Sequence, residues 1–137
     1  MEQEAPKLIL LVDDDKDFAE IVTTKLAASG FRAAVAHDGS EGLQLAHELR
    51  PDLILLDIQM PGMTGAEMFF KMKEEDRELS RIKVIFLTSY GEPRKEDAWL
   101  DEKFAKDMGA LDYIRKTDDL DSIVTQVRTA FLAQNPF

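Results

Sequence analysis

The stretch that most constrains the fold runs from residue 51 to 65 and reads PDLILLDIQMPGMTG. Its four consecutive apolar residues, 53–56, are typical of a strand that is covered on both faces, as in a parallel sheet. A single acid, Asp57, ends this run, and Met-Pro-Gly at 60–62 then interrupts regular structure. The pattern predicts that Asp57 lies at the carboxyl end of a central strand, where open α/β sheets place their ligand crevices.

Two further apolar runs end in polar side chains. The residues that follow runs 8–12 and 84–87 are Asp13, Asp14 and Asp15 in the first case, and Thr88 and Ser89 in the second. An Asp in such a place is often a turn former or a helix cap; either Asp15 or Asp14 can cap the helix that follows, and Asp15 is expected to be a cap or a solvated charge rather than a ligand. Because the carboxyl ends of parallel strands meet at one edge of a sheet, the three runs together predict a shared site.

Strand-like and helical patterns alternate along the chain. The expected strands are residues 7–12, 31–36, 53–57, 84–87 and 111–115, and the expected helices are 16–28, 39–49, 65–75, a fourth around Trp99, and 120–131. This order predicts right-handed crossovers and a parallel sheet with helices on both faces. Residues 1–6 are expected to form a short mobile tail.

The first and last helices show clear apolar faces. Their apolar positions are Phe18, Ile21, Val22 and Leu26 in the first helix, and Leu120, Ile123, Val124, Val127 and Phe131 in the last. The helical spacing of these residues predicts that both faces pack on the sheet.

Composition limits the partners and the setting. A chain of 137 residues with 45% hydrophobic residues is expected to form one domain, residues 1–137. The net charge of −10 disfavours nucleic acid as a direct partner, since phosphate binding needs clustered Lys and Arg. The chain has no cysteine, no apolar run of membrane-span length and no signal-peptide pattern at its start, so we expect no membrane association and a cytoplasmic location.

The converging side chains suit magnesium and phosphoryl chemistry. Asp13, Asp14 and Asp57 in one crevice would raise each other's pKa values unless a cation offset their charges. An all-oxygen carboxylate site suits Mg²⁺, beside which a carboxylate can attack a phosphoryl group. Lys116, just past the last strand, could then supply a cation to the phosphoryl oxygens, and Thr88 a hydroxyl donor.

Four segments, LILLVDDD, LILLDIQMPGMTG, FLTSY and GALDYIRK, occur in an order and at a spacing that resemble the response regulator receiver domain, the CheY-like family of two-component signalling. The resemblance covers nearly the whole chain. It implies a flavodoxin-like, doubly wound (βα)5 fold with a five-stranded parallel sheet of order 2-1-3-4-5. It also implies a phosphorylation switch rather than an enzyme, with at most self-phosphorylation and autodephosphorylation.

The resemblance further implies roles for the acids at the predicted crevice. It makes Asp57 the phospho-acceptor. It makes Asp14 and Asp57 direct Mg²⁺ ligands together with the backbone carbonyl of Gln59, and Asp13 a ligand through water.

Three other residues take roles from the same resemblance. Thr88 and Lys116 would contact the phosphoryl group, and Tyr113 would be an aromatic switch that moves when Thr88 moves. The phosphoryl group would come from a sensor histidine kinase or a histidine phosphotransfer protein. A downstream protein target would bind the face formed by the fourth helix, fifth strand and fifth helix.

The sequence departs from the family pattern at two places. Thr117 stands where the family usually has a proline joined to the lysine by a cis peptide bond. We expect a trans bond here, because a cis bond before a non-proline residue costs about 2.5 to 4 kcal/mol. Lys116 follows Thr88 by 28 positions, a longer spacing than the family usually has, and GEPRKEDAWLDE is the expected extension of the loop or helix between them.

Two alternatives remain open at the level of sequence. A Mg²⁺-dependent phosphohydrolase or phosphotransferase would also use an Asp nucleophile, but it would need a general acid and a substrate-covering cap that the sequence does not indicate. An unphosphorylated receiver-like docking module would differ in taking no label from acetyl phosphate and Mg²⁺. The sequence predicts either a single-domain regulator or an excised module, and it does not indicate the pathway, the cognate kinase, the output, the oligomeric state or the phosphate lifetime.

Overall fold

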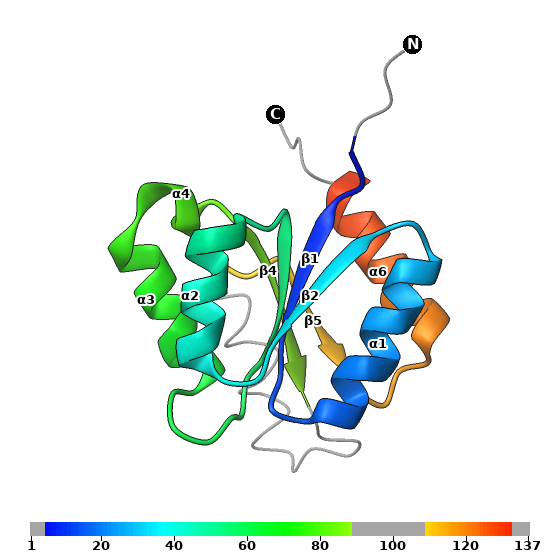
Figure 1. The fold of residues 1–137 in the computed structure, drawn as a ribbon, viewed down its shortest axis with the longest axis horizontal. Helices are drawn as coiled ribbons and strands as arrows, with labels where there is room; N and C mark the ends of the chain where they lie inside the picture. The colour runs from blue at the N-terminus through cyan, green and yellow to red at the C-terminus, as the bar shows by residue number, and fades with distance from the viewer. Residues whose placement is uncertain (1–4, 89–108, 133–137) are drawn as a thin grey trace.

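The computed structural model describes residues 5–88 and 109–132. Within them lies one five-stranded parallel sheet of order β2-β1-β3-β4-β5 (Figure 1). The strands are β1 (Leu8–Val12), β2 (Arg32–Ala36), β3 (Leu53–Asp57), β4 (Lys83–Thr88) and β5 (Asp112–Arg115). The predicted α/β fold with strand order 2-1-3-4-5 is therefore confirmed.

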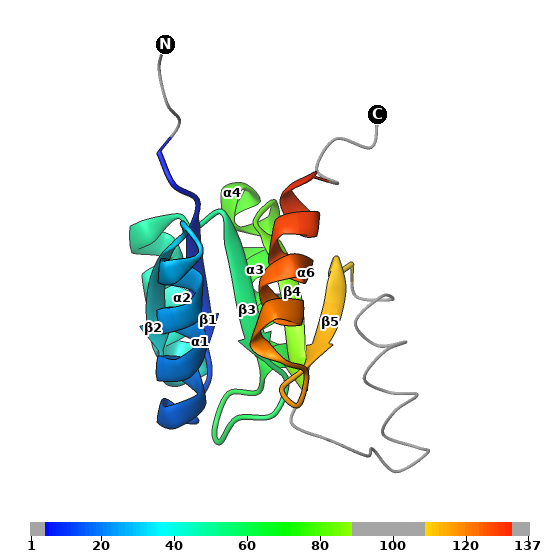
Figure 2. The same cartoon turned by 90° about the vertical axis from the view of Figure 1, so that its right-hand side faces the viewer.

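Helices cover both faces of this sheet. On one face lie α1 (Lys16–Ala28) and α6 (Leu120–Leu132), and on the other lie α2 (Gly39–Leu49), α3 (Gly65–Glu75) and the single turn α4 (Arg77–Ser80) (Figure 1). The view in Figure 2 shows β4 and β5 ending at the same edge of the sheet. The predicted helix around Trp99 lies outside the described residues.

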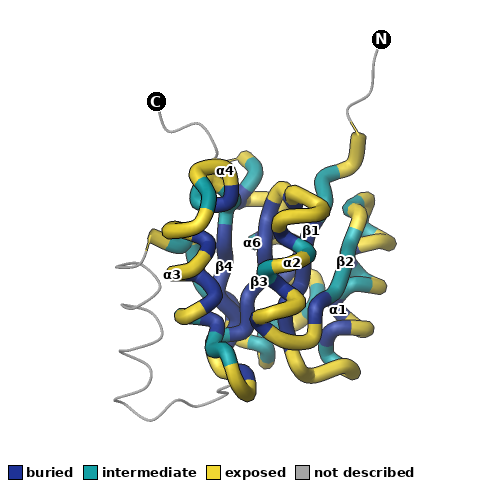
Figure 3. The backbone as a smooth tube through the Cα atoms, turned by 60° about the vertical axis from the view of Figure 1, so that its left-hand side comes forward, coloured by how far each residue is buried: buried dark blue, intermediate teal, exposed yellow. Residues whose placement is uncertain are grey.

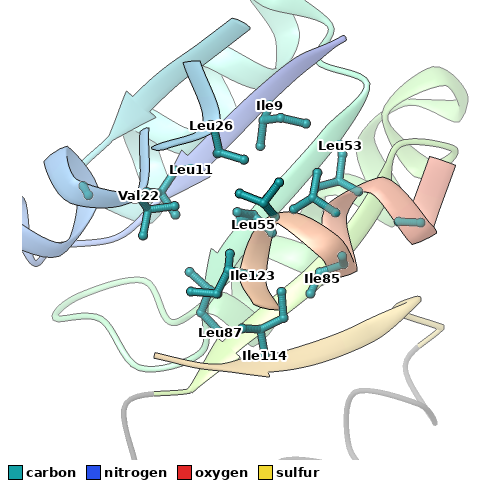
Figure 4. Close-up of a cluster of buried hydrophobic side chains, with 14 residues drawn as sticks. Ile9, Leu11, Val22, Leu26, Leu53, Leu55, Ile85, Leu87, Ile114 and Ile123 are labelled. Carbon is teal, nitrogen blue, oxygen red and sulfur yellow. The ribbon is translucent and has the colours of Figure 1, made fainter. Parts of the chain in front are cut away.

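Strand side chains alternate between two apolar cores, and β3 is buried along its whole length (Figure 3). Ile9, Leu11, Leu53, Leu55, Ile85 and Leu87 pack with α1 and α6 (Figure 4). The intervening residues, among them Leu10, Ile54 and Phe86, pack with α2 and α3. Because an apolar core covers each face of β3, a side chain at the carboxyl end of this strand is held in place and largely shielded from solvent.

Side-chain caps set where the helices begin. The carboxylate of Asp15 accepts a hydrogen bond from the Phe18 N–H at 3.1 Å, so Asp15, and not Asp14, is the cap of the first helix. Thr64 caps α3 in the same way, accepting from the Glu67 N–H at 3.1 Å. Asp15 lies three residues after the end of β1, whereas Thr64 lies seven residues after the end of β3, so the loop into α3 is the longer of the two.

Two details differ from the sequence analysis. The turn α4 was not predicted; the Asp76 carboxylate caps it by accepting from the Glu78 N–H at 2.8 Å, and buried Leu79 anchors it. Ile21, predicted to be on the buried face of the first helix, is 53% exposed. The face of α1 that packs on the sheet is centred instead on Ala19, Val22 and Leu26, so Ile21 points to one side of it.

Candidate functional site

The carboxyl ends of three adjacent strands carry the buried polar side chains. Among the described residues, the buried polar or charged ones are Asp13, Asp57 and Thr88, with exposed fractions of 0%, 2% and 4%. Asp13 follows β1 directly, Asp57 ends β3 and Thr88 ends β4. Burial of polar groups costs free energy. Buried polar side chains at the ends of strands therefore indicate a functional site rather than helix caps.

Three carboxylates meet in this crevice. Asp13, Asp14 and Asp57 each offer one oxygen, and these oxygens lie within 4.8 Å of one another. Asp13 and Asp57 are buried whereas Asp14 is exposed, so the cluster has an open side. The Asp13 Oδ1 atom accepts from the Asp15 N–H at 2.9 Å, and its buried Oδ2 atom forms an ion pair with Lys116. Three carboxylate oxygens so close together, with an open side to the crevice, form an all-oxygen donor set that fits Mg²⁺.

Lys116 supplies the positive charge at this cluster. Its Nζ lies 2.7 Å from Asp13 Oδ2 and 3.2 Å from Asp57 Oδ2, and its side chain is 11% exposed. Its backbone N–H donates to the Thr88 carbonyl oxygen at 2.8 Å, which fixes the start of the loop after β5. None of the described peptide bonds is cis, so the expected trans bond before Thr117 is confirmed.

The environment shifts the pKa values of Asp57 and Lys116 in the same direction. Burial, followed by the negative charge of Asp13, raises the pKa of Asp57 to about 7, although Lys116 opposes the shift. Burial lowers the pKa of Lys116, but hydrogen bonding to Asp13 and the charges of both carboxylates outweigh it, so this pKa is raised overall. The charge of Asp13 thus contributes to the raised pKa of Asp57, as the predicted crowding of acids requires.

The backbone around Asp57 is held closely. The Gln59 N–H donates to Asp57 Oδ1 at 3.2 Å, and the Ile58 N–H donates to the Leu87 carbonyl oxygen at 3.0 Å. A Cβ atom on Gly65 would lie 2.1 Å from the Asp57 carbonyl oxygen. Only glycine fits there, a role that the sequence analysis missed although the Thr-Gly pair at 64–65 marks the place where α3 begins against the strand.

One aromatic ring lies beside Lys116, and another shares a face of the sheet with Thr88. Tyr113 is half-buried and pairs in register with Phe86, and side-chain alternation places Thr88 on the same face of the sheet. The Phe18 ring has its centroid 4.9 Å from Lys116 Nζ. The sequence analysis placed Phe18 in the core and assigned it no part in the site, because nothing in the sequence brings residue 18 near residue 116.

Comparisons with known proteins agree with this fold and cluster. The profile of the response regulator receiver domain matches residues 9–128, and the chain belongs to that family. Its relatives include the DNA-binding response regulator MtrA of Mycolicibacterium smegmatis, 38% identical over 88% of this chain and 48% of MtrA. Another is the uncharacterized transcriptional regulatory protein YkoG of Bacillus subtilis, 32% identical over 93% of this chain and 51% of YkoG. The chain thus spans about half the length of these curated relatives.

Solved structures give the same assignment. A CheY-like receiver domain protein of Methanospirillum hungatei superposes with a TM-score of 0.79 at 27% identity, covering 94% of this chain and 96% of that one. The receiver domain of the Francisella response regulator 1452 also gives 0.79, at 25% identity and 94% and 99% coverage. The chain is thus a receiver domain of two-component response regulators, a signalling switch, and its acidic pocket fits a phospho-acceptor site.

No helix in the described part of the chain is long and apolar enough to cross a bilayer.

Proposed function

We propose that Asp57 accepts the phosphoryl group, and that a sensor histidine kinase or a histidine phosphotransfer protein donates it. The observation that supports this is a buried carboxylate at the end of the central strand, with Lys116 Nζ 3.2 Å away and two more carboxylates beside it. An Asp57 oxygen forms the new bond to phosphorus as the bond from phosphorus to the donor's histidine nitrogen breaks. Because the nucleophile is the ionised carboxylate, the charge of Lys116 favours the reactive form.

Magnesium belongs to the same proposal. Asp14, Asp57 and the Gln59 carbonyl would hold the ion directly, and Asp13 through water; when bound, Mg²⁺ neutralises charge on the phosphoryl oxygens. Lys116 adds a second positive charge on the side of Asp13, and the Thr88 hydroxyl donates to a phosphoryl oxygen. The exposed Asp14 leaves the crevice open to donor and ion.

The output side of the proposal involves β5 and α6. Tyr113, on the same face as Thr88, moves when Thr88 is drawn toward the phosphoryl group. A protein target then binds the surface that β5, α6 and the predicted helix around Trp99 form. We propose that residues 1–137 act as one receiver unit. A net charge of −10 argues that this unit makes no direct contact with DNA, even though MtrA is a DNA-binding regulator.

The proposal is tested by incubating the protein with acetyl phosphate and Mg²⁺ and measuring intact mass. Wild type is expected to gain one phosphoryl group, Asp57→Asn none, and Asp14→Asn much less than wild type. Asp17→Asn, which removes an exposed acid from the first turn of α1, serves as the matched control and should label like wild type. Equal labelling of wild type and Asp57→Asn would overturn the assignment.

A further inference from the structure

Among the described residues, two carboxylates and one aromatic ring lie close to the Lys116 ammonium. Its Nζ lies 2.7 Å from Asp13 Oδ2, 3.2 Å from Asp57 Oδ2 and 4.9 Å from the centroid of the Phe18 ring. A cation over a ring face within about 6 Å is attracted by the negative face of the π-system. The contact is more favourable where water is excluded, as it is around this largely buried lysine.

Phe18 is itself held in place from two directions. Its backbone N–H donates to the capping carboxylate of Asp15, which fixes the first turn of α1 beside the crevice. Its half-buried ring packs against the core formed with α1 and α6. The ring is therefore anchored on the helix and the core, and not on Asp13 or Asp57.

Unlike the two carboxylates, the Phe18 ring takes no part in the proposed metal binding or phosphoryl transfer. Asp13 and Asp57 are both residues of the proposed magnesium site, and Asp57 is the residue that the proposed reaction converts. A carboxylate that binds a metal ion or carries a phosphoryl group is less available to Lys116, whereas the ring has no oxygen to offer a metal ion and is not altered by the reaction.

We propose that Phe18 is a positioning residue that holds the Lys116 ammonium beside Asp57 for phosphoryl transfer. This rests on the proposed function, since it gives Lys116 a role at the phosphoryl group. Phe18 does not touch the reacting atoms; it acts through Lys116 by restricting where the long, flexible side chain can place its charge.

The test compares Phe18→Leu, which keeps an apolar side chain but removes the ring, with Phe18→Tyr, which keeps the ring. Ile21→Leu is the matched control, because Ile21 lies on the same helix and is 53% exposed. The first readout is the proton chemical shift of the Lys116 ε-methylene group in EDTA. It should be displaced upfield by the ring in wild type, Phe18→Tyr and Ile21→Leu, and not in Phe18→Leu. An unchanged shift in Phe18→Leu would overturn the contact.

The second readout is the rate of phosphorylation by acetyl phosphate with Mg²⁺. Phe18→Leu should be slower than wild type by about two- to thirty-fold, the range expected for one cation–π contact between an exposed and a water-excluded setting, while Phe18→Tyr and Ile21→Leu keep the wild-type rate. If wild type is labelled and Phe18→Leu is labelled equally fast, the positioning role is wrong and the proposed function stands. If wild type takes no label at all, the proposed function fails and the positioning role fails with it.

Discussion

At the scale of single residues, the electrostatic cost of the site is concentrated in one carboxyl group. Asp57 is 2% exposed, and its pKa is raised to about 7 by burial and then by the charge of Asp13. Asp14, although it is the third acid of the cluster, is exposed and is not among the groups that raise this pKa. Removal of charge at Asp57 and at Asp14 should therefore affect the metal-free protein differently.

Asp57→Asn is expected to stabilise the metal-free protein in a pH-dependent way. Because the folded pKa of Asp57 lies above its unfolded value of 3.8, the folded state holds the proton more tightly, and wild type loses stability as pH rises from about 4 to about 7. Asparagine avoids this loss. The difference in free energy of unfolding, variant minus wild type, should be near zero at pH 4 and reach at most about 4 kcal/mol above pH 7, since one pKa unit corresponds to about 1.4 kcal/mol.

Urea unfolding in EDTA at pH 4, 5.5 and 7.5 measures this difference. Asp14→Asn is the comparison variant and should change stability little at any of the three values, because water already solvates that carboxylate. A difference for Asp57→Asn that stays constant or shrinks as pH rises would show that the buried charge is not the cause.

At the scale of elements, close packing between α3 and the end of β3 positions Asp57. A Cβ atom on Gly65 would lie 2.1 Å from the Asp57 carbonyl oxygen, 2.9 Å from the Asp57 carbonyl carbon and 2.9 Å from the Ile58 Cα atom. These neighbours are backbone atoms that cannot rotate away. A side chain at residue 65 must therefore push α3 away from the strand end.

Gly65→Ala is expected to cost about 2 kcal/mol or more of stability, in the range of overpacked cores, and to slow labelling by acetyl phosphate. Gly62→Ala is the control in the same loop. Gly62 has φ of +75° but no atom within 4 Å of a built Cβ, so its cost should be about 1 kcal/mol and come from backbone conformation alone. Urea unfolding of both variants checks this, and equal costs would mean that the contact with Asp57 relaxes easily.

The sequence predicted the strands and helices better than it predicted the contacts between them. Runs such as 53–56 showed the buried strands, and the spacing of Ile123, Val124 and Val127 showed the packed face of the last helix. The convergence of Asp13, Asp57 and Thr88 followed from strand polarity alone. The roles of Gly65 and Phe18 did not, because each depends on a distance between elements that no local pattern records. Exposure of Ile21 was missed for a related reason, since apolar spacing gives a face only to within about one residue.

At the scale of the whole molecule, a chain of net charge −10 gathers three carboxylates in one crevice and offsets them with the Lys116 ammonium. A divalent cation that binds there binds only the folded state, because the three acids come together only through the sheet. Folding and the proposed binding of magnesium are thus expected to be coupled.

Mg²⁺ is therefore expected to raise the melting temperature. At a concentration 100-fold above its dissociation constant it should add about 2.7 kcal/mol of stability. Asp14→Asn should lose most of this gain, whereas Asp17→Asn, with the same net charge, should keep it. Choline chloride at matched ionic strength controls for screening of the acidic surface. An equal gain in all three proteins would indicate screening rather than a site at the crevice.

The most direct measurement of the central claim locates the phosphoryl group on the chain. The protein is treated with acetyl phosphate and Mg²⁺, the acyl phosphate is trapped by borohydride reduction, and the modified residue is identified by peptide mass spectrometry. The account predicts that Asp57 alone is reduced, and that omission of Mg²⁺ or the change Asp57→Asn abolishes the product. Reduction at Asp13 or Asp14 in place of Asp57, or no reduction in labelled wild-type protein, would contradict it.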